Sequence, residues 1–380
     1  MNIKTITFII IMINCLYNYS FAQNNIAQPK QSQEHKNSLI YVCKPCDLSC
    51  DKLSFTESGI CPHCNMELIK KSDLISEKEL ILNEINIQSG SGAFLIEGGI
   101  GNEDKKIKVF YHKPKNFRTT SRVLIVVPGS GRNADSYRDA WVEESEKYGA
   151  LILSPMYKEV EYDYGAYHMG NLIYNLNLES SAKYDQNSNK VFLDEELFSF
   201  EINSNRNEWI YNDFDRIFDN VVKALGSTQT EYDIFGHSAG GQILHRLAIF
   251  QPNSKANKIL ASNSGSYTLP DFNNELPFGI ENTVLTKENI ETSFKKNLVL
   301  FIGELDNENE QGGLMLRSPS VDKQGTHRLE RGKYFFNKSK DIAEELGYEF
   351  NWKIIVVQKV GHNHRKMGNA AGEYLYGKDK

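Results

Sequence analysis

The chain has 380 residues and a formal net charge of −6, with 40% hydrophobic and 24% charged residues. This composition is typical of a soluble globular protein with a hydrophobic core, and the length allows two or three domains. The acidic balance excludes a strongly basic protein, so nucleic acid is not expected as a partner.

Residues 1–22 have the pattern of an export signal peptide. Lys4 is the only charged residue, an apolar run follows at Ile6–Ile13, and Ser20-Phe-Ala22 places small residues where a signal peptidase cuts. The apolar run is too short to cross a membrane as a helix, so no transmembrane segment is expected. We therefore expect cleavage near Ala22 and a secreted or periplasmic protein.

A lipid anchor at Cys15 is the alternative to a cleaved signal. Asn14 precedes this cysteine and is larger than the small residue usual at that position, which disfavours a lipoprotein. Residues 23–39 are rich in Gln, Asn and Lys and offer little to bury, so we interpret them as a disordered linker.

Five of the six cysteines lie between residues 43 and 64. Two C-x-x-C pairs, Cys43/Cys46 and Cys61/Cys64, are separated by fourteen residues, which is close to a zinc-ribbon spacing. Two such pairs can complete a tetrahedral site of four thiolates, which leaves no open position for catalysis. Because a segment this short has too little apolar surface to fold alone, residues 40–71 are predicted to form a Cys-rich module around a structural zinc.

The chemistry of this module has alternatives. An exported chain meets an oxidising compartment, which favours disulfides, although an odd number of cysteines fits them poorly. Cys50 is an extra thiol, and Cys46, Cys50 and His63 offer alternatives within the ligand set. Residues 41–68 resemble the short heavy-metal-binding modules of exported bacterial proteins, which tend to read C-P-x-C-G-M-x-L where this chain has Cys61-Pro-His-Cys-Asn-Met-Glu-Leu68.

From residue 72 onward apolar strands alternate with amphipathic helices, which predicts one α/β domain with a mostly parallel sheet flanked by helices over residues 72–380. Gly90-Ser-Gly92 precedes its strand and lacks the third glycine of a dinucleotide fingerprint, so it is interpreted as a turn. Helices are expected at 134–148, 208–225 and 242–250. Strands are expected at 93–96 and 107–112 as an antiparallel pair, and at 122–127, 150–154, 232–235, 258–261, 297–302 and 352–357.

Residues 157–207 interrupt this alternation. They are rich in Tyr, Asn and Glu with poor periodicity, and a long insertion of this kind usually covers the active-site edge of a sheet and shapes the substrate pocket. His168 and the tyrosines at 157, 162, 164 and 167 could stack on a sugar or aromatic group. Packing of the insertion on itself is the slightly favoured alternative.

The sequence Gly236-His-Ser-Ala-Gly-Gly241 stands between a predicted strand and a predicted helix. This context is that of a G-x-S-x-G nucleophile elbow, in which a sharp turn exposes a serine hydroxyl above the sheet. The glycines allow strand and helix to approach closely, and the N-terminus of the helix favours negative charge near the serine. Ser238 is therefore the candidate nucleophile.

Two further strand ends supply an acid and a base. Asp306 follows the strand 297–302 and is the candidate acid, with Glu304 as the alternative. His362 follows the last strand directly after a glycine and is the candidate base, with His364 as the alternative. The chain order Ser238, Asp306, His362 is the order found in α/β-hydrolases.

The loop Pro128-Gly-Ser-Gly-Arg132 follows the strand 122–127. In an acyl-transfer enzyme a backbone amide of this loop and the amide of Ala239 would form an oxyanion hole. Ser130 is the predicted first donor and Gly131 is the alternative.

Taken together, residues 105–378 resemble α/β-hydrolases of the polyhydroxyalkanoate-depolymerase and feruloyl-esterase kind. The resemblance rests on residues 126–137, 236–241, 303–306 and 360–362. It implies the α/β-hydrolase fold, a serine nucleophile and hydrolysis of an ester. Pro128 stands where many members have His, which questions the usual polar bracing of that loop. Residues 324–331 are a candidate for the substrate side without an assigned role.

The leading hypothesis is an exported serine hydrolase that cleaves small-molecule or polymeric carboxylic esters through an acyl-enzyme, with no cofactor for catalysis. Peptidase or amidase activity uses the same machinery and is the first alternative. A binding protein that kept the fold but lost turnover is the second. A metal-delivery or metal-sensing role centred on the Cys-rich module is the third, and the oligomeric state is left open.

Overall fold

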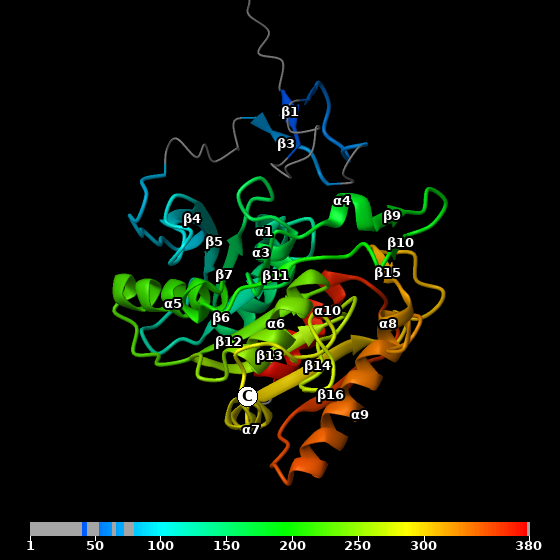
Figure 1. Cartoon of the computed structure of the whole chain (residues 1–380). Coiled ribbons are helices and arrows are strands. Elements are labelled where there is room, and N and C mark those ends of the chain that lie inside the picture. The colour runs from blue at the N-terminus through cyan, green and yellow to red at the C-terminus, as the bar shows by residue number, and fades with distance from the viewer. Residues whose placement is uncertain (1–39, 44–52, 63–65, 72–79, 378–380) are drawn as a thin grey trace, which may run out of the picture. The chain divides into compact units, whose positions relative to one another are not determined.

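The computed structural model describes residues 40–43, 53–62, 66–71 and 80–377 (Figure 1). The predicted export signal and linker lie outside the described residues, as do Cys46, Cys50, His63 and Cys64. Among the helices of the described ranges, none has the length and apolar character needed to cross a membrane.

Two cysteines of the Cys-rich module share a small core. Strands β1 (Tyr41–Val42), β2 (Ser54–Phe55) and β3 (Ile69–Lys70) form an antiparallel sheet in the order β2-β1-β3. Cys43 and Cys61 are buried with Leu68, and the Cys61 amide donates to the carbonyl oxygen of Met66 at 2.7 Å. The segments on either side of residues 63–65 are therefore hydrogen-bonded to each other.

An eight-stranded sheet forms the centre of the large domain, in the order β16-β14-β13-β12-β6-β7-β5-β4 (Figure 1). The pairs β4–β5 and β5–β7 are antiparallel and all other pairs are parallel. This confirms the expected α/β class and mostly parallel sheet. The strands are β4 (Gly90–Glu97), β5 (Lys106–Lys113), β6 (Val123–Val127), β7 (Leu151–Met156), β12 (Tyr232–His237), β13 (Ala256–Ser262), β14 (Asn297–Gly303) and β16 (Lys353–Val357).

Helices cover both faces of this sheet, because its strands are apolar on both sides and bury both. Leu124, Val126 and Phe235 face the core that contains α1 (Ala134–Asp139) and α10 (His364–Tyr376). The alternate residues Ile125, Val127 and Ile234 face the other core. That second core includes residues of α5 (Tyr211–Leu225), α6 (Ala239–Phe250), α7 (Lys287–Phe294) and α9 (Arg328–Leu346).

The strand order reverses at β6. Strand β7 pairs with β6 on one side and β12 pairs with it on the other. In open α/β sheets, ligands bind outside the carboxyl ends of the strands at such a switch point. The loops after β6 and β12 are therefore the natural walls of a site, and these loops contain Ser130 and Ser238.

Two local expectations were wrong. Gly90-Ser-Gly92 is the start of β4 and not a turn, because Gly92 pairs with Tyr111 of β5 and leaves room for its side chain, whose hydroxyl an added Cβ would approach to 2.4 Å. The single helix expected over residues 134–148 is divided into α1 and α2 (Val142–Tyr148). The break is at Trp141, whose ring packs edge-on against Phe235 in the core at 5.3 Å.

The insertion 157–207 contains more regular structure than its composition suggests. Its β8 (Ile173–Tyr174) pairs with β11 (Glu201–Ile202), while β9 (Ala182–Tyr184) and β10 (Lys190–Leu193) join β15 (Met315–Arg317). It also holds α3 (Tyr164–His168), α4 (Leu178–Ser181) and the 3₁₀ helix η4 (Arg206–Glu208). A further short helix, α8 (Pro319–Asp322), follows β15.

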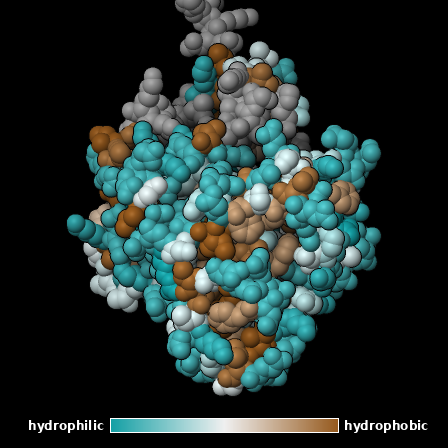
Figure 2. All heavy atoms as spheres, in the orientation of Figure 1, coloured by the Kyte–Doolittle hydropathy of each residue, from teal (hydrophilic) through white to brown (hydrophobic). Residues whose placement is uncertain are grey.

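Seen in the orientation of Figure 1, the surface is mainly hydrophilic with scattered hydrophobic residues (Figure 2).

Candidate active site

Ser238 lies at the turn between β12 and α6 in a strained backbone conformation. Its φ of 60° and ψ of −116° are unusual for a residue with a side chain. Its amide donates to the carbonyl oxygen of Ser262 at the end of β13, at 2.9 Å. The neighbouring strand therefore holds the turn, and the strain is retained because the surrounding structure fixes it.

The glycines of this turn are required by close backbone contacts. A Cβ on Gly236 would lie 2.5 Å from the Gly240 carbonyl oxygen, and a Cβ on Gly240 would lie 2.2 Å from the Val127 carbonyl oxygen. A Cβ on Gly241 would lie 2.4 Å from the Ser262 carbonyl oxygen. These distances are shorter than any real Cβ contact, so this turn has the close strand–helix packing that a nucleophile elbow requires.

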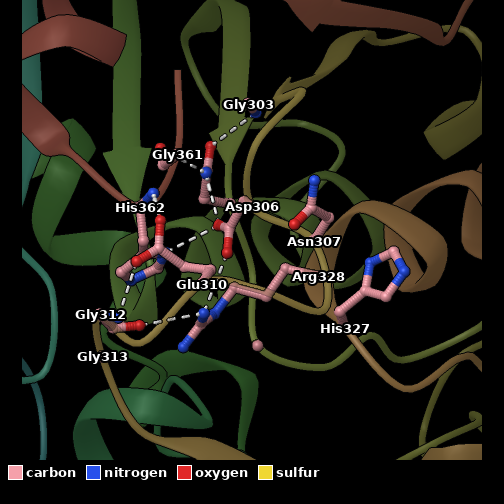
Figure 3. A network of polar contacts seen from close by, with 12 residues as sticks. Gly303, Asp306, Asn307, Glu310, Gly312, Gly313, His327, Arg328, Gly361 and His362 are labelled. Atoms are coloured by element: carbon pink, nitrogen blue, oxygen red, sulfur yellow. Dashed lines mark hydrogen bonds and ion pairs between the residues drawn. The ribbon is translucent and has the colours of Figure 1, made fainter. Parts of the chain in front are cut away.

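Asp306 and His362 come together from the ends of β14 and β16 (Figure 3). The His362 Nδ1 lies 2.8 Å from the Asp306 Oδ2, and both side chains are buried. The His362 backbone amide donates to Glu310 Oε2 at 2.6 Å, which fixes the loop that carries the ring. With Nδ1 facing the carboxylate, Nε2 is the ring nitrogen left to exchange a proton with a substrate or nucleophile.

Three contacts with Asp306 and its loop were not anticipated from the sequence. Arg328, the first residue of α9, donates from Nη1 to Asp306 Oδ1 at 3.0 Å and from Nη2 to the Leu314 carbonyl oxygen at 2.8 Å. Asn263 donates from Nδ2 to Asp306 Oδ2 at 2.6 Å. A polar residue directly after β13 is a signal that would have pointed to Asn263, whereas nothing local to Arg328 indicates its partner.

These contacts set the protonation of the pair. Burial lowers the pKa of His362, and the Arg328 charge lowers it further, against the opposing effect of Asp306. Burial alone would raise the pKa of Asp306, but the hydrogen bond and charge of His362, together with Arg328 and Asn263, hold it below its usual value. At neutral pH the pair is therefore a neutral imidazole beside an ionised carboxylate.

The ring of His362 lies against the elbow. Its centroid is 4.5 Å from that of His237, the residue before Ser238. His237 is buried, and burial with the neighbouring histidines lowers its pKa well below the usual value, so it is neutral. Its Nδ1 lies 3.3 Å from the Tyr137 hydroxyl.

Hydrogen bonds to residues of the insertion 157–207 brace the loop after β6. The Tyr167 hydroxyl donates to the Pro128 carbonyl oxygen at 2.8 Å. Arg132 donates from Nη1 to the carbonyl oxygens of Tyr157 and Tyr162 at 3.0 and 2.6 Å. Residues of the insertion therefore hold this loop in place.

A cavity of about 360 Å³ opens beside Ser238. The candidate oxyanion donors Ser130, Gly131 and Ala239 line it together with the serine. The amide of Ala239 is in the first turn of α6, where helix amides have no carbonyl of their own helix to bond. The insertion contributes nearly half of the lining: Glu159, Tyr164, His168, Leu178, Ala182, Tyr184 and Val191.

The aromatic residues of the insertion have divided roles. Tyr157, Tyr162 and Tyr167 are buried, and the Tyr157 ring packs against the other two at 5.0 and 5.7 Å. Tyr164 and His168 stack at 4.1 Å and line the cavity. The three buried tyrosines therefore pack within the insertion, whereas Tyr164 and His168 are available to a ligand.

The alternative residues make other contacts. Glu304 Oε2 accepts from the Lys359 amide at 2.8 Å. His364 begins α10 and stacks on Tyr137 at 4.3 Å. Residues 324–331, considered for the substrate side, contribute no residue to the cavity beside Ser238. Their buried side chains instead hold loops together, as when Gln324 Nε2 donates to the Tyr267 carbonyl oxygen at 2.7 Å.

Two solved structures with a similar fold are hydrolases. The chain is 29% identical to poly(aspartic acid) hydrolase-1 from Sphingomonas sp. KT-1, with a TM-score of 0.64, covering 76% of this chain and 100% of that one. It is 22% identical to LpqC, the poly(3-hydroxybutyrate) depolymerase from Bordetella parapertussis, with a TM-score of 0.65, covering 77% and 91%. No family model matches the sequence, and no curated protein matches it. The chain therefore shares the mostly parallel α/β fold of these two hydrolases.

Proposed function

We propose that this protein is an exported serine hydrolase that cleaves carboxylic esters with Ser238, His362 and Asp306. The observation that carries the proposal is the His362–Asp306 pair, 2.8 Å apart, whose ring packs on the elbow that holds Ser238 in strained geometry. A strained serine at a strand–helix turn and a buried carboxylate–imidazole pair are the elements that a covalent acyl-transfer mechanism requires.

The proposed reaction has two steps. His362 Nε2 takes the proton of the Ser238 hydroxyl as its oxygen attacks the ester carbonyl, and Asp306 stabilises the resulting imidazolium. The amides of Ser130 and Ala239 donate to the developing oxyanion, the alcohol leaves with the proton from His362, and an acyl-enzyme forms. Water activated by the same histidine then releases the acid.

The substrate enters a pocket shaped by the insertion. We assign residues 157–207 the role of a cap, because seven of them line the cavity beside Ser238. The cavity volume of about 360 Å³ suits a small acyl group or one end of a polymer, and is in the usual range for small-molecule sites.

Substitution of the nucleophile tests the proposal directly. Ser238→Ala should abolish hydrolysis of simple aryl esters and labelling by a fluorophosphonate, while the melting temperature stays close to that of the wild type. A matched control is Ser136→Ala, a half-buried serine of α1 outside the cavity lining, which should keep both activities. Undiminished ester hydrolysis by Ser238→Ala would end the proposal.

Amide hydrolysis is the second candidate. It is favoured by the similarity to a hydrolase of poly(aspartic acid), a polymer linked by amides. The same serine, histidine and oxyanion donors serve both reactions, so the fold alone does not separate them. Comparison of kcat/KM for an ester and an amide with the same acyl group distinguishes the two candidates.

We also propose a structural metal in the Cys-rich module. Cys43 and Cys61 fit this role because both are buried in one small core, where the Cys61 amide donates to the Met66 carbonyl oxygen. Cys46 and Cys64 would complete the site but lie outside the described residues. Measured zinc close to one equivalent per chain, lost on Cys61→Ser, supports a metal, whereas disulfides found by mass spectrometry in its place would contradict it.

A further inference from the structure

Arg246 of α6 is a buried cation that has no acidic partner in the described part of the chain. The residue is 1% exposed to solvent. Nε donates to the Thr268 hydroxyl at 2.8 Å, and Nη1 donates to the carbonyl oxygens of His168 at 2.7 Å and Gln242 at 3.4 Å. All three acceptors are neutral, and Nη2 has no hydrogen-bond partner among the described residues.

Such a charge is costly unless something compensates it. Buried arginines are normally paired with a carboxylate or phosphate, because removing an unpaired charge from water costs several kcal/mol or more. The nearby phenols of Tyr164 and Tyr211 do not supply a negative charge, since burial raises the pKa of both above its usual value. Arg331, another fully buried arginine among the described residues, does have a carboxylate partner, Asp322, at 3.1 Å.

Arg246 also lines a small cavity of about 30 Å³. Its walls are mainly apolar, and Ser266 is a small polar residue among them. The volume holds about two water molecules, which is the size of a carboxylate group. Tyr164, Leu178 and Leu316 line both this cavity and the larger one beside Ser238, so the two cavities are neighbours.

One face of helix α6 contributes residues to both cavities. Ser238, Gln242 and Arg246 are four residues apart, which places them along one side of α6. Eight residues correspond to a rise of about 12 Å, and helical side chains point back toward the N-terminus, here toward Ser238. An acyl chain attached to Ser238 could therefore reach the guanidinium with roughly four to six carbons, by the same rise and side-chain direction.

We propose that the acyl group of the substrate carries a carboxylate, which occupies the small cavity and pairs with Arg246. The substrate class is thus a monoester of a short dicarboxylic acid, or an anionic polymer whose repeat presents a carboxylate at the same distance. The carboxylate accepts from Arg246 Nη2 and from the Ser266 hydroxyl, and the apolar walls strengthen the ion pair by excluding water. This inference rests on the proposed ester hydrolysis at Ser238.

A matched pair of substrates tests the charge preference without any substitution. Phenyl hemiglutarate and the phenyl ester of glutaramic acid have nearly the same shape, but only the first is anionic. The wild-type protein should have a kcat/KM at least tenfold higher for the anionic ester, and a series from malonate to adipate should show a maximum at an intermediate length. An equal or higher kcat/KM for the neutral ester would overturn the proposal.

Variants of Arg246 locate the effect. Arg246→Gln should reduce the ratio of the two kcat/KM values to near one, and Arg246→Lys should retain part of it because the charge is kept. If Arg246→Gln does not fold, the wild-type ratio and its salt dependence still decide the question. A ratio that survives Arg246→Gln in a folded protein would refute the assignment to this residue.

Binding to Ser238→Ala separates this inference from the proposed function. Glutarate should bind that variant in calorimetry, and glutaramide should bind at least tenfold more weakly. Hydrolysis of neutral esters without glutarate binding would refute the anionic site and leave the esterase proposal intact. Glutarate binding without hydrolysis of any ester would refute the esterase proposal and leave the anionic site intact. Competition by glutarate or by oligo(aspartic acid) then distinguishes a free dicarboxylate from an anionic polymer as the source.

Discussion

The most informative perturbation is Asp306→Asn, because it removes a charge that two buried groups share. Asp306 accepts from His362 at 2.8 Å and from Arg328 at 3.0 Å. An asparagine can accept at only one side-chain atom, so its amide nitrogen faces a donor at one of these contacts. The imidazole then loses either its correct tautomer or its stabilising charge.

The expected loss is large. The equivalent change in a serine hydrolase triad lowers kcat about 10⁴-fold, which corresponds to about 5.4 kcal/mol in the activation free energy. Stability should fall as well, since Arg328 is 2% exposed and would keep a buried charge without its ion-pair partner. Breaking a buried ion pair in this way costs about 3–5 kcal/mol.

Matched variants separate catalysis from folding. Glu304→Gln changes the neighbouring acid, whose side chain accepts only from the Lys359 amide among the described residues, and should keep the rate of aryl ester hydrolysis within about twofold of the wild type, as for surface changes. The double variant Asp306→Asn with Arg328→Met removes both charges and should recover stability but not activity.

The assay is steady-state hydrolysis of an aryl ester together with the rate of fluorophosphonate labelling and thermal unfolding. The reasoning is refuted if folded Asp306→Asn keeps its activity within tenfold of the wild type, or if Glu304→Gln shows the larger loss.

Three further predictions concern the surroundings of this pair. Activity requires neutral His362 and should be lost as the pH falls through the pKa of His362, which lies below 6.5. Arg328→Met should move this acid limb of the kcat/KM profile to higher pH, because it removes a positive charge beside His362. Arg328→Lys keeps the charge and should leave the limb nearer the wild-type position. Gly240→Ala places a Cβ 2.2 Å from a backbone oxygen at the end of β6, so both expression of folded protein and activity should be lost, and a soluble, active variant would show that the elbow can relax. Tyr167→Phe removes the 2.8 Å hydrogen bond to the loop after β6 and should lower the free energy of unfolding in urea by about 1–3 kcal/mol, with unchanged stability arguing against a bracing role.

The sequence alone determined the fold class and the position of the elbow. Apolar strands alternating with amphipathic helices are local patterns, so they predicted a mostly parallel sheet before its strand order was known. The spacing Gly236-His-Ser-Ala-Gly-Gly241 is local too, because each glycine is required by contacts within one strand–turn–helix unit or with the adjacent strands. These features depend on residues close together in the chain, and a linear pattern can carry them.

The tertiary structure decided which polar groups meet. Asp306 and Glu304 are two residues apart at the end of one strand, and only the packing of β14 beside β16 turns the first toward His362. Arg328 and Asn263, the partners of Asp306, come from other elements of the fold. Arg246 has no acidic partner among the described residues, which only the tertiary structure shows. The pairing of charges depends on contacts between distant segments, whose distances no local periodicity encodes, and for that physical reason the sequence could propose the groups but not their partners.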